Sequence, residues 1–238
     1  MKSKLFKFGF PAIIITFISL SVTLSSCDEV LDYLNLSDAE VAQALKEALT
    51  VGTDTSVSRG AATNGYFGNQ LIKILLPPEA DPIISAVGLI PGGQTLIDNV
   101  VLKLNRAAED AAVKATPIFV DAITGITITD AMGILQGQND AATMYLKGAT
   151  QAEINAIFRP HIEESLEAVG AQSAWAQLTS SYNSIPFVTP VSTDLAGYTT
   201  TKATDGLFVM VAEEEAKIRT DAEHQVSDLL QRVFGGQQ

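Results

Sequence analysis

The sequence is poor in the residues that most often build catalytic and metal sites. It contains one cysteine and two histidines, and aromatic residues make up 7% of the chain. A disulfide within the chain is excluded because it needs two cysteines. The glycine and serine patterns of phosphate-binding loops, dinucleotide-binding folds and serine hydrolases are also absent. The sequence therefore favours a protein that is not an enzyme, and it indicates no cofactor.

The two histidines do not form a recognisable metal motif. His161 has Glu164 three residues after it, and His224 has Asp221 three residues before it. Helical two-metal proteins use Glu-x-x-His pairs together with further glutamates. Here one pair is reversed and the other uses aspartate, so we expect no histidine-bound metal.

Signals for β-strands are equally scarce. Residues 71–78 (LIKILLPP) alternate briefly before two prolines end the run. Helix start signals are frequent, because a Ser or Thr followed three residues later by an acid opens a capping box. They occur at Ser37–Glu40, Thr127–Asp130, Thr150–Glu153 and Thr220–Glu223, and helix-ending glycines are expected at Gly52, Gly137, Gly170 and Gly235. The sequence predicts an all-α fold, a single compact multi-helix domain of about eight helices.

Basic residues are outnumbered by acids. The chain has 15 lysines and arginines against 27 aspartates and glutamates, a formal net charge of −12. Nucleic-acid phosphates repel such a surface, and anionic lipid does not attract it. We expect no nucleic-acid partner, and any attachment to a membrane has to come from another source.

The first 26 residues have the pattern of a secretory signal peptide. Lys2, Lys4 and Lys7 are followed by an apolar stretch that reaches about Leu24. A basic start before a short apolar region is typical of such signals. Cleavage would remove three of the 15 basic residues and no acids, which leaves 12 against 27 and a net charge of −15.

The signal ends in LSSC, which resembles the lipobox of bacterial lipoproteins. In that class, cleavage before the cysteine is coupled to attachment of a diacylglycerol to its thiol, and Cys27 is the only cysteine. The alternative is a spare cysteine beside an ordinary cleavage site. We expect a signal peptide over residues 1–26, a short tether over 27–33 and a helical domain over 34–238. The expected location is the bacterial cell envelope, anchored by Cys27 in the outer membrane and facing the periplasm or the exterior.

Several stretches resemble a known family. They are LIKILLPPEA, NRAAEDAAVKATPIFVDAITGITITDAMGILQGQNDAATMYL, DGLFVMVAEEEAKIR and LLQRVFG. Together they resemble the bacterial family catalogued as domain of unknown function 4197, over roughly residues 34–235. The resemblance implies a helical domain in secreted or lipid-anchored proteins. It implies no activity, so no catalytic residue can be transferred.

Polar residues are ordered on the predicted helix around residues 98–115. At 100° per residue Asp98, Asn105 and Glu109 lie on one line, between an apolar face and a charged face. Arg106 lies beside them as a possible partner. These groups are expected to fix the packing of a neighbouring segment or, less often, to line a pocket.

A second group lies in the stretch DGLFVMVAEEEAKIR. Glu214 falls within the apolar stripe of that helix, and Glu215 is placed to pair with Arg219 one turn later. A buried carboxylate needs a partner, a proton or a cation. We therefore predict a polar cluster of Asp98, Asn105, Arg106, Glu109, Glu214 and Arg219, in which Asn105 and Glu109 face Glu214 or its flanking acids across a helix contact.

Three functions remain open from the sequence. The first is a binding module for a small or apolar ligand or a protein partner. The second is an architectural envelope protein without a ligand, and the third is a carboxylate-based hydrolase or metal-binding protein. A large pocket that contains Glu109 and Glu214 would favour the first or the third, whereas a filled core with both acids paired would favour the second.

Overall fold

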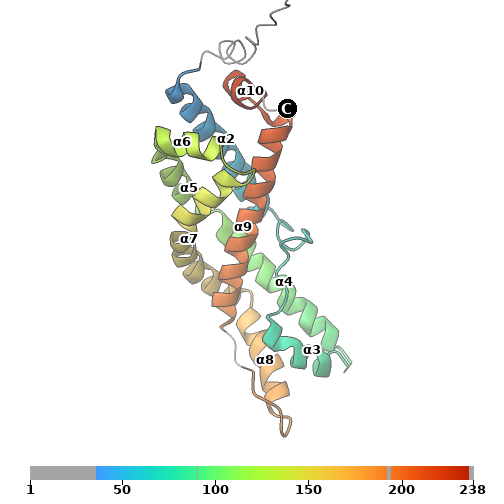
Figure 1. The fold of residues 1–238 in the computed structure, drawn as a ribbon. Coiled ribbons are helices and arrows are strands. Elements are labelled where there is room, and N and C mark those ends of the chain that lie inside the picture. The colour runs from blue at the N-terminus through green and yellow to red at the C-terminus, as the bar shows by residue number, and fades with distance from the viewer. Residues whose placement is uncertain (1–35, 90, 192–193, 236–238) are drawn as a thin grey trace, which may run out of the picture. The chain divides into compact units, whose positions relative to one another are not determined.

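Four long α-helices form the centre of the fold (Figure 1). They are α2 (Asp38–Ala61), α4 (Gly93–Ala112), α7 (Ala141–Ala168) and α9 (Leu195–Thr220). Helix α9 packs against the other three, and α4 also packs against α2 and α7. This computed structural model describes residues 36–89, 91–191 and 194–235, and Cys27 lies outside them.

Five shorter helices surround this centre in two groups. Helices α5 (Ala115–Thr124), α6 (Ile128–Leu135) and α10 (Asp228–Phe234) pack against α2, whereas α3 (Asp81–Val87) and α8 (Ala171–Asn183) pack against α4. Two 3-10 turns, η1 (Pro78–Ala80) and η2 (Ala222–His224), complete the described elements. The prediction of a single compact all-α domain is confirmed, with nine α-helices and no strand among the described residues.

Two of the four predicted capping boxes begin helices. Ser37 Oγ accepts a hydrogen bond from the N–H of Glu40 at 3.3 Å, and the Glu40 carboxylate accepts one from the N–H of Ser37 at 2.8 Å. Thr127 and Asp130 form the same reciprocal pair before α6. Backbone and side-chain hydrogen bonds from Ser37 and Thr127 lower the pKa of the two carboxyl groups. These signals therefore mark helix starts by satisfying amides that the helix cannot.

The other two predicted starts are wrong. Thr150 lies inside α7, where its hydroxyl donates to the carbonyl of Leu146 at 2.7 Å. Thr220 is the last residue of α9, and α10 begins only after Ser227, whose hydroxyl accepts from the N–H of Leu230 at 3.2 Å. A Thr-x-x-Glu spacing also fits the interior or end of a helix, because a hydroxyl can bond back to the preceding turn.

The predicted helix-ending glycines divide in the same way. Gly137, Gly170 and Gly235 follow α6, α7 and α10, and Gly170 has a φ of +68° that favours glycine. Gly52, in contrast, lies within α2. A Cβ atom there would lie 3.6 Å from the Cβ of Glu214. Gly52 therefore lies at the contact of α2 with α9 and does not end a helix.

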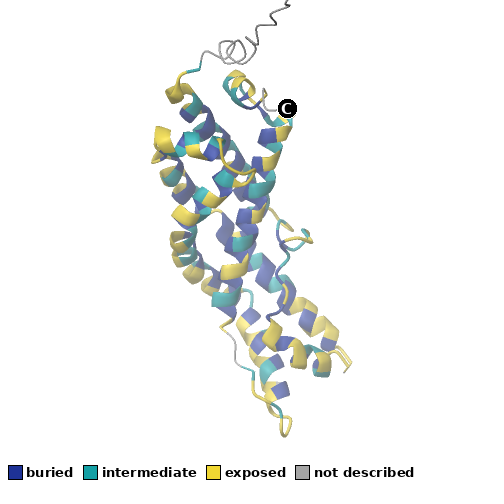
Figure 2. Ribbon diagram, in the orientation of Figure 1, coloured by how far each residue is buried: buried dark blue, intermediate teal, exposed yellow. Residues whose placement is uncertain are grey.

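Buried side chains follow the facing sides of the helices (Figure 2). On α4 the predicted apolar face is confirmed, and its buried members include Val100, Val101, Leu104, Ala108 and Ala111. Among the described residues no single helix is long and apolar enough to cross a membrane. Helices α5 and α6 pass that test only as a pair, and they are bent by 104° at their junction.

Candidate functional site

Asn105 on α4 fixes the loop of residues 62–77, which connects α2 to η1. Its side-chain amide donates to the carbonyl of Ile74 at 2.8 Å, and its carbonyl oxygen accepts from the N–H of Ile74 at 2.9 Å. The same amide also donates to the carbonyl of Val101 at 2.7 Å. Asn105 is fully buried. Its side chain therefore takes the place that a neighbouring strand would have beside Ile74.

Glu109, one turn after Asn105, holds the first part of the same loop. One carboxylate oxygen accepts from the N–H groups of Tyr66 and Phe67 at 3.2 and 3.1 Å. The other oxygen pairs with Arg106, whose second guanidinium nitrogen donates to Asn64 at 2.8 Å. Asn64 has a φ of +68°, a left-handed conformation that asparagine tolerates better than most residues. One turn of α4 thus secures a strained turn of the loop.

Tyr66 carries the loop into the core. Its side chain is fully buried, and its hydroxyl donates to the carbonyl of Ala203 on α9 at 2.7 Å. Burial and the negative charge of Glu109 raise the pKa of Tyr66 far above its ordinary value, so the hydroxyl stays protonated as a donor. Gly206 leaves room for this ring, because a Cβ atom there would lie 2.8 Å from it.

Glu214 on α9 is neutralised by cations at the surface. Its carboxylate accepts hydrogen bonds from Arg59 of α2 at 2.6 Å and from Lys217 at 2.7 Å. Arg59 also pairs with Glu213 at 3.0 Å. The Glu214 side chain is 6% exposed, whereas those of Arg59 and Lys217 are 40% and 42% exposed. The predicted burial of Glu214 is confirmed. Its partners are Arg59 and Lys217, not the Arg106, Arg159, Asn105 or backbone amides that the sequence suggests.

Glu215, the next residue, caps the start of α7. Its two oxygens accept from the backbone N–H groups of Ala142 and Thr143 at 3.0 and 2.8 Å and from the Thr143 hydroxyl at 2.7 Å. The predicted pair with Arg219 is confirmed at 2.9 Å. Arg219 also donates to the carbonyl of Ile134. A carboxylate at a helix start satisfies free amides and complements the helix dipole.

This capping role of Glu215 is not evident from the residues around α7. Asp140 is the N-cap residue of α7, but its side chain makes no capping hydrogen bond. The carboxylate that replaces it comes from α9, more than 70 residues later in the chain. A cavity beside Glu215 and Arg219 has a volume of about 20 Å³ and is otherwise lined mainly by apolar side chains. That volume holds about one water molecule and no larger ligand.

The structure places the six residues of the predicted cluster in three parts of the fold: the contact of α4 with the 62–77 loop, helix α9, and the exposed side of the first half of α4. Asn105, Arg106 and Glu109 hold the 62–77 loop, while Glu214 and Arg219 belong to two adjacent networks on α9. Asp98 is exposed and accepts a hydrogen bond from Gln94 at 2.8 Å. Seven residues separate Asp98 from Asn105, which places it about 10 Å further along the helix. Glu109 and Glu214 share no hydrogen-bond or ion-pair partner among the described residues, because Arg106 and the loop amides bind the first and Arg59 and Lys217 bind the second.

An open groove lies on the outer side of the same loop. This α9 groove is lined by residues 71–75 of the loop and by Tyr198, Lys202, Asp205, Gly206 and Val209 of α9. Its volume is about 270 Å³. Leu71, Leu75 and Val209 are 76%, 59% and 40% exposed. The groove therefore exposes apolar side chains and two lysines, whereas the polar groups on the other side of the loop already have hydrogen-bond partners.

Outside the α9 groove, one exposed aromatic side chain and one histidine were also candidates for a site. Phe187 is fully exposed with a φ of +68°, but it is a single side chain on the loop after α8. His224 pairs with Asp221 at 3.0 Å near the surface. Among the described residues no group of three or more His, Cys, Asp or Glu side chains is arranged to hold a metal ion.

Comparison with known proteins identifies the family. Residues 35–235 match the family described as Protein of unknown function (DUF4197), and the chain belongs to that family. No curated protein and no solved structure matches the chain.

Proposed function

We propose that this protein is a lipid-anchored binding module of the bacterial envelope, which contacts a protein partner through the α9 groove. The observation that carries the proposal is a contrast within the described residues. The buried carboxylates are occupied by partners within the chain, whereas Leu71, Leu75 and Val209 stand exposed around an open groove. Apolar side chains gathered at a concave surface are typical of interaction sites.

The occupied acids argue against an internal reaction centre. A carboxylate that acts as a base or nucleophile needs an oxygen within reach of a substrate. Glu109 uses both oxygens to hold the loop, and Glu215 uses both to cap α7. The cavity beside Glu215 is too small for a substrate. A hydrolase that uses these acids is therefore the weakest of the three functions.

An architectural role is the second candidate. It is favoured by the same pairing of Glu109 and Glu214, which fills the core without leaving a pocket around either acid. The two candidates differ in what the α9 groove does. A binding module uses the exposed groove residues, whereas an architectural protein tolerates their replacement.

The anchor is supported by the sequence, where a basic and apolar signal precedes LSSC and Cys27. The acidic mature chain has no electrostatic attraction to anionic lipid, so stable attachment requires acyl chains. We expect Cys27→Ser to leave the membrane fraction or to remain unprocessed, as fractionation and intact mass would show. Unchanged membrane association with an unchanged mass would contradict the anchor.

Site-specific photocrosslinking in the native host tests the binding role. A photoreactive amino acid at Leu75 is compared with one at Ile128, which has a similar exposure of 49% and lies at the start of α6. We expect a discrete protein adduct from Leu75 and none from Ile128. Absence of an adduct at Leu75, or the same adducts at both positions, would favour the architectural role.

A further inference from the structure

The groove side of the 62–77 loop contains a short segment, residues 73–76, that follows a turn and alternates between surface and core. Ile72, Ile74 and Leu76 point into the core, whereas Leu71 and Leu75 are exposed on either side of the half-buried Lys73. This alternation is that of an extended chain with one buried face. Gly206 of α9 lets the segment pack closely, because a Cβ atom there would lie 3.1 Å from the Cβ of Ile72.

The two edges of this segment differ. Ile74 is paired with Asn105, whereas on the opposite edge Leu75 is unpaired within the described part of the chain, between Lys73, whose N–H donates to the carbonyl of Asn69 at 2.8 Å, and Pro77, which has no N–H. Asn105 binds both the N–H and the C=O of Ile74. In an extended chain the next residue directs its N–H and C=O to the opposite edge. Within the described residues the N–H and C=O of Leu75 have no hydrogen-bond partner. An unpaired edge of this kind is a template for an added strand.

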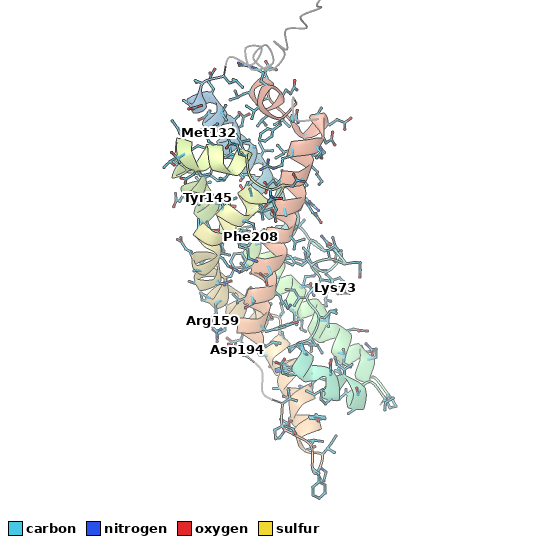
Figure 3. The ribbon with its side chains drawn as sticks, in the orientation of Figure 1. Lys73, Met132, Tyr145, Arg159, Asp194 and Phe208 are labelled. Atoms are coloured by element: carbon cyan, nitrogen blue, oxygen red, sulfur yellow. The ribbon has the colours of Figure 1, made fainter. Side chains whose placement is uncertain are left out.

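The charge of the groove differs from that of the chain. Lys73 lies 4.2 Å from the ring centre of Phe67, and Lys202 lies 5.9 Å from that of Tyr198. Neither lysine forms a salt bridge with a described residue, whereas Asp205 is paired with Lys147 at 3.1 Å. Lys73 stands on the loop beside α9, apart from the Arg159–Asp194 pair (Figure 3). Two such lysines in a protein of net charge −12 favour an acidic ligand.

The two lysines and the exposed apolar side chains together define the ligand. It has acidic groups toward Lys73 and Lys202 and apolar groups against Leu71, Leu75 and Val209.

We propose that the α9 groove binds an extended acidic segment of a partner protein, which adds a strand to the open edge at Leu75. Backbone hydrogen bonds to Leu75 hold the segment, its carboxylates lie at Lys73 and Lys202, and its alternate apolar side chains cover the exposed leucines. This inference rests on the proposed binding role and names the class of partner. A fatty acid shares the carboxylate and the apolar chain, but it has no backbone to pair with Leu75.

Labelled octapeptides test the inference by fluorescence anisotropy with the full chain carrying Cys27→Ser. The probes are an alternating Val-Asp peptide, its Val-Lys counterpart and a Val-Asp peptide with alternate backbone nitrogens methylated. We expect saturable binding of the first probe only, with at least tenfold weaker binding of the other two. Equal binding of all three, or no binding of the Val-Asp probe, overturns the inference.

Two variants assign that binding to the groove. Lys73→Glu combined with Lys202→Glu should weaken the Val-Asp peptide at least tenfold, whereas Lys114→Glu, an exposed control at the start of α5, should not. Circular dichroism checks that each variant is folded. Equal affinity in the double variant overturns the inference, and so does full displacement of the peptide by decanoate, which would indicate a small amphiphile. If a photoadduct forms at Leu75 but the peptides fail, the partner class is wrong and the binding role stands.

Discussion

Glu109 and Glu215 solve the same structural problem in two regions of the molecule. Each carboxylate accepts hydrogen bonds from two consecutive backbone N–H groups of another segment, and each pairs with an arginine one turn away on its own helix. Glu109 serves a loop, whereas Glu215 serves the first turn of a 28-residue helix. The shared arrangement shows that a buried acid can connect two segments of the chain through its hydrogen bonds.

The arginines account for the main difference. The Arg106 side chain is 33% exposed and reaches water, whereas that of Arg219 is 8% exposed. Removal of Glu215 would leave a cation in the interior without its acid, and removal of Glu109 would not. We therefore expect the Glu215 region to depend more strongly on its charge than the Glu109 region.

The largest effect is expected for Glu215→Ala. It leaves Arg219 and two amides of α7 without their acceptor, and breaking such a buried pair costs about 3–5 kcal/mol of the free energy of unfolding. Urea unfolding followed by circular dichroism measures this loss. The double variant Glu215→Leu with Arg219→Met should lose less than Glu215→Ala, because it buries no unpaired charge. A larger loss in the double variant would show that the charges themselves stabilise the fold.

A smaller effect is expected for Asn105→Ala, which removes both hydrogen bonds to Ile74. Two buried backbone groups lose their partner, so we expect a loss of about 2–3 kcal/mol in the free energy of unfolding. Thr201→Ala is a suitable control, because that exposed hydroxyl bonds only within α9. If Asn105→Ala unfolds at the same urea concentration as the wild type, the loop does not depend on this side chain.

The next smaller effect is expected for Glu109→Gln, which removes the charge of the side chain and keeps its shape. The amide oxygen still accepts from Tyr66 or Phe67, while Arg106 loses its anion and turns to water. A loss of about 1–2 kcal/mol is expected, close to that of one charged hydrogen bond. The same substitution at Glu215 should have a greater effect, and thermal unfolding of the two variants side by side measures the difference. Equal losses would remove the distinction between the two regions.

The smallest effect is expected for Glu214→Gln. Its cations are well exposed, so solvent screens the pair and the loss should be below about 1 kcal/mol. Melting with a chelator and with added calcium, zinc or manganese tests whether a cation also binds there. With Arg59 and Lys217 already at the carboxylate, no metal should raise the melting temperature of the wild type. A metal-dependent increase that disappears in Glu214→Gln, but not in Glu213→Gln, would identify a cation site.

The periodicity of the sequence predicts which side chains are buried better than it predicts what they touch. The apolar face of α4 and the burial of Glu214 both follow from residue spacing along one helix. The partners do not, since Tyr66 lies 43 residues before Glu109 and Arg59 lies 155 residues before Glu214. Asp98 shows that shared position on a helix does not predict shared contacts. It is spaced along α4 to lie in line with Asn105 and Glu109, but the 62–77 loop contacts only the latter two.

A local sequence signal fails where the same residue pattern fits two different positions in a helix. Thr150 and Ser37 each precede a glutamate by three residues, but only Ser37 lies at the end of a helix, where amides are free. Gly52 has the sequence context of a helix end and instead lies within α2, facing α9. In each case the outcome depends on where the residue lies in its helix, which three or four neighbouring residues do not determine.

The attachment of the 62–77 loop to a single turn of α4 also has a consequence for its motions. The N–H groups of Tyr66, Phe67 and Ile74 all donate to side chains of Asn105 or Glu109. Amides that share one support become open to solvent in one cooperative event. In hydrogen exchange these three amides should lose protection together, although eight residues separate the first from the last. The loop that borders the α9 groove would then open and close as one unit. A segment bound to it would slow the hydrogen exchange of all three amides.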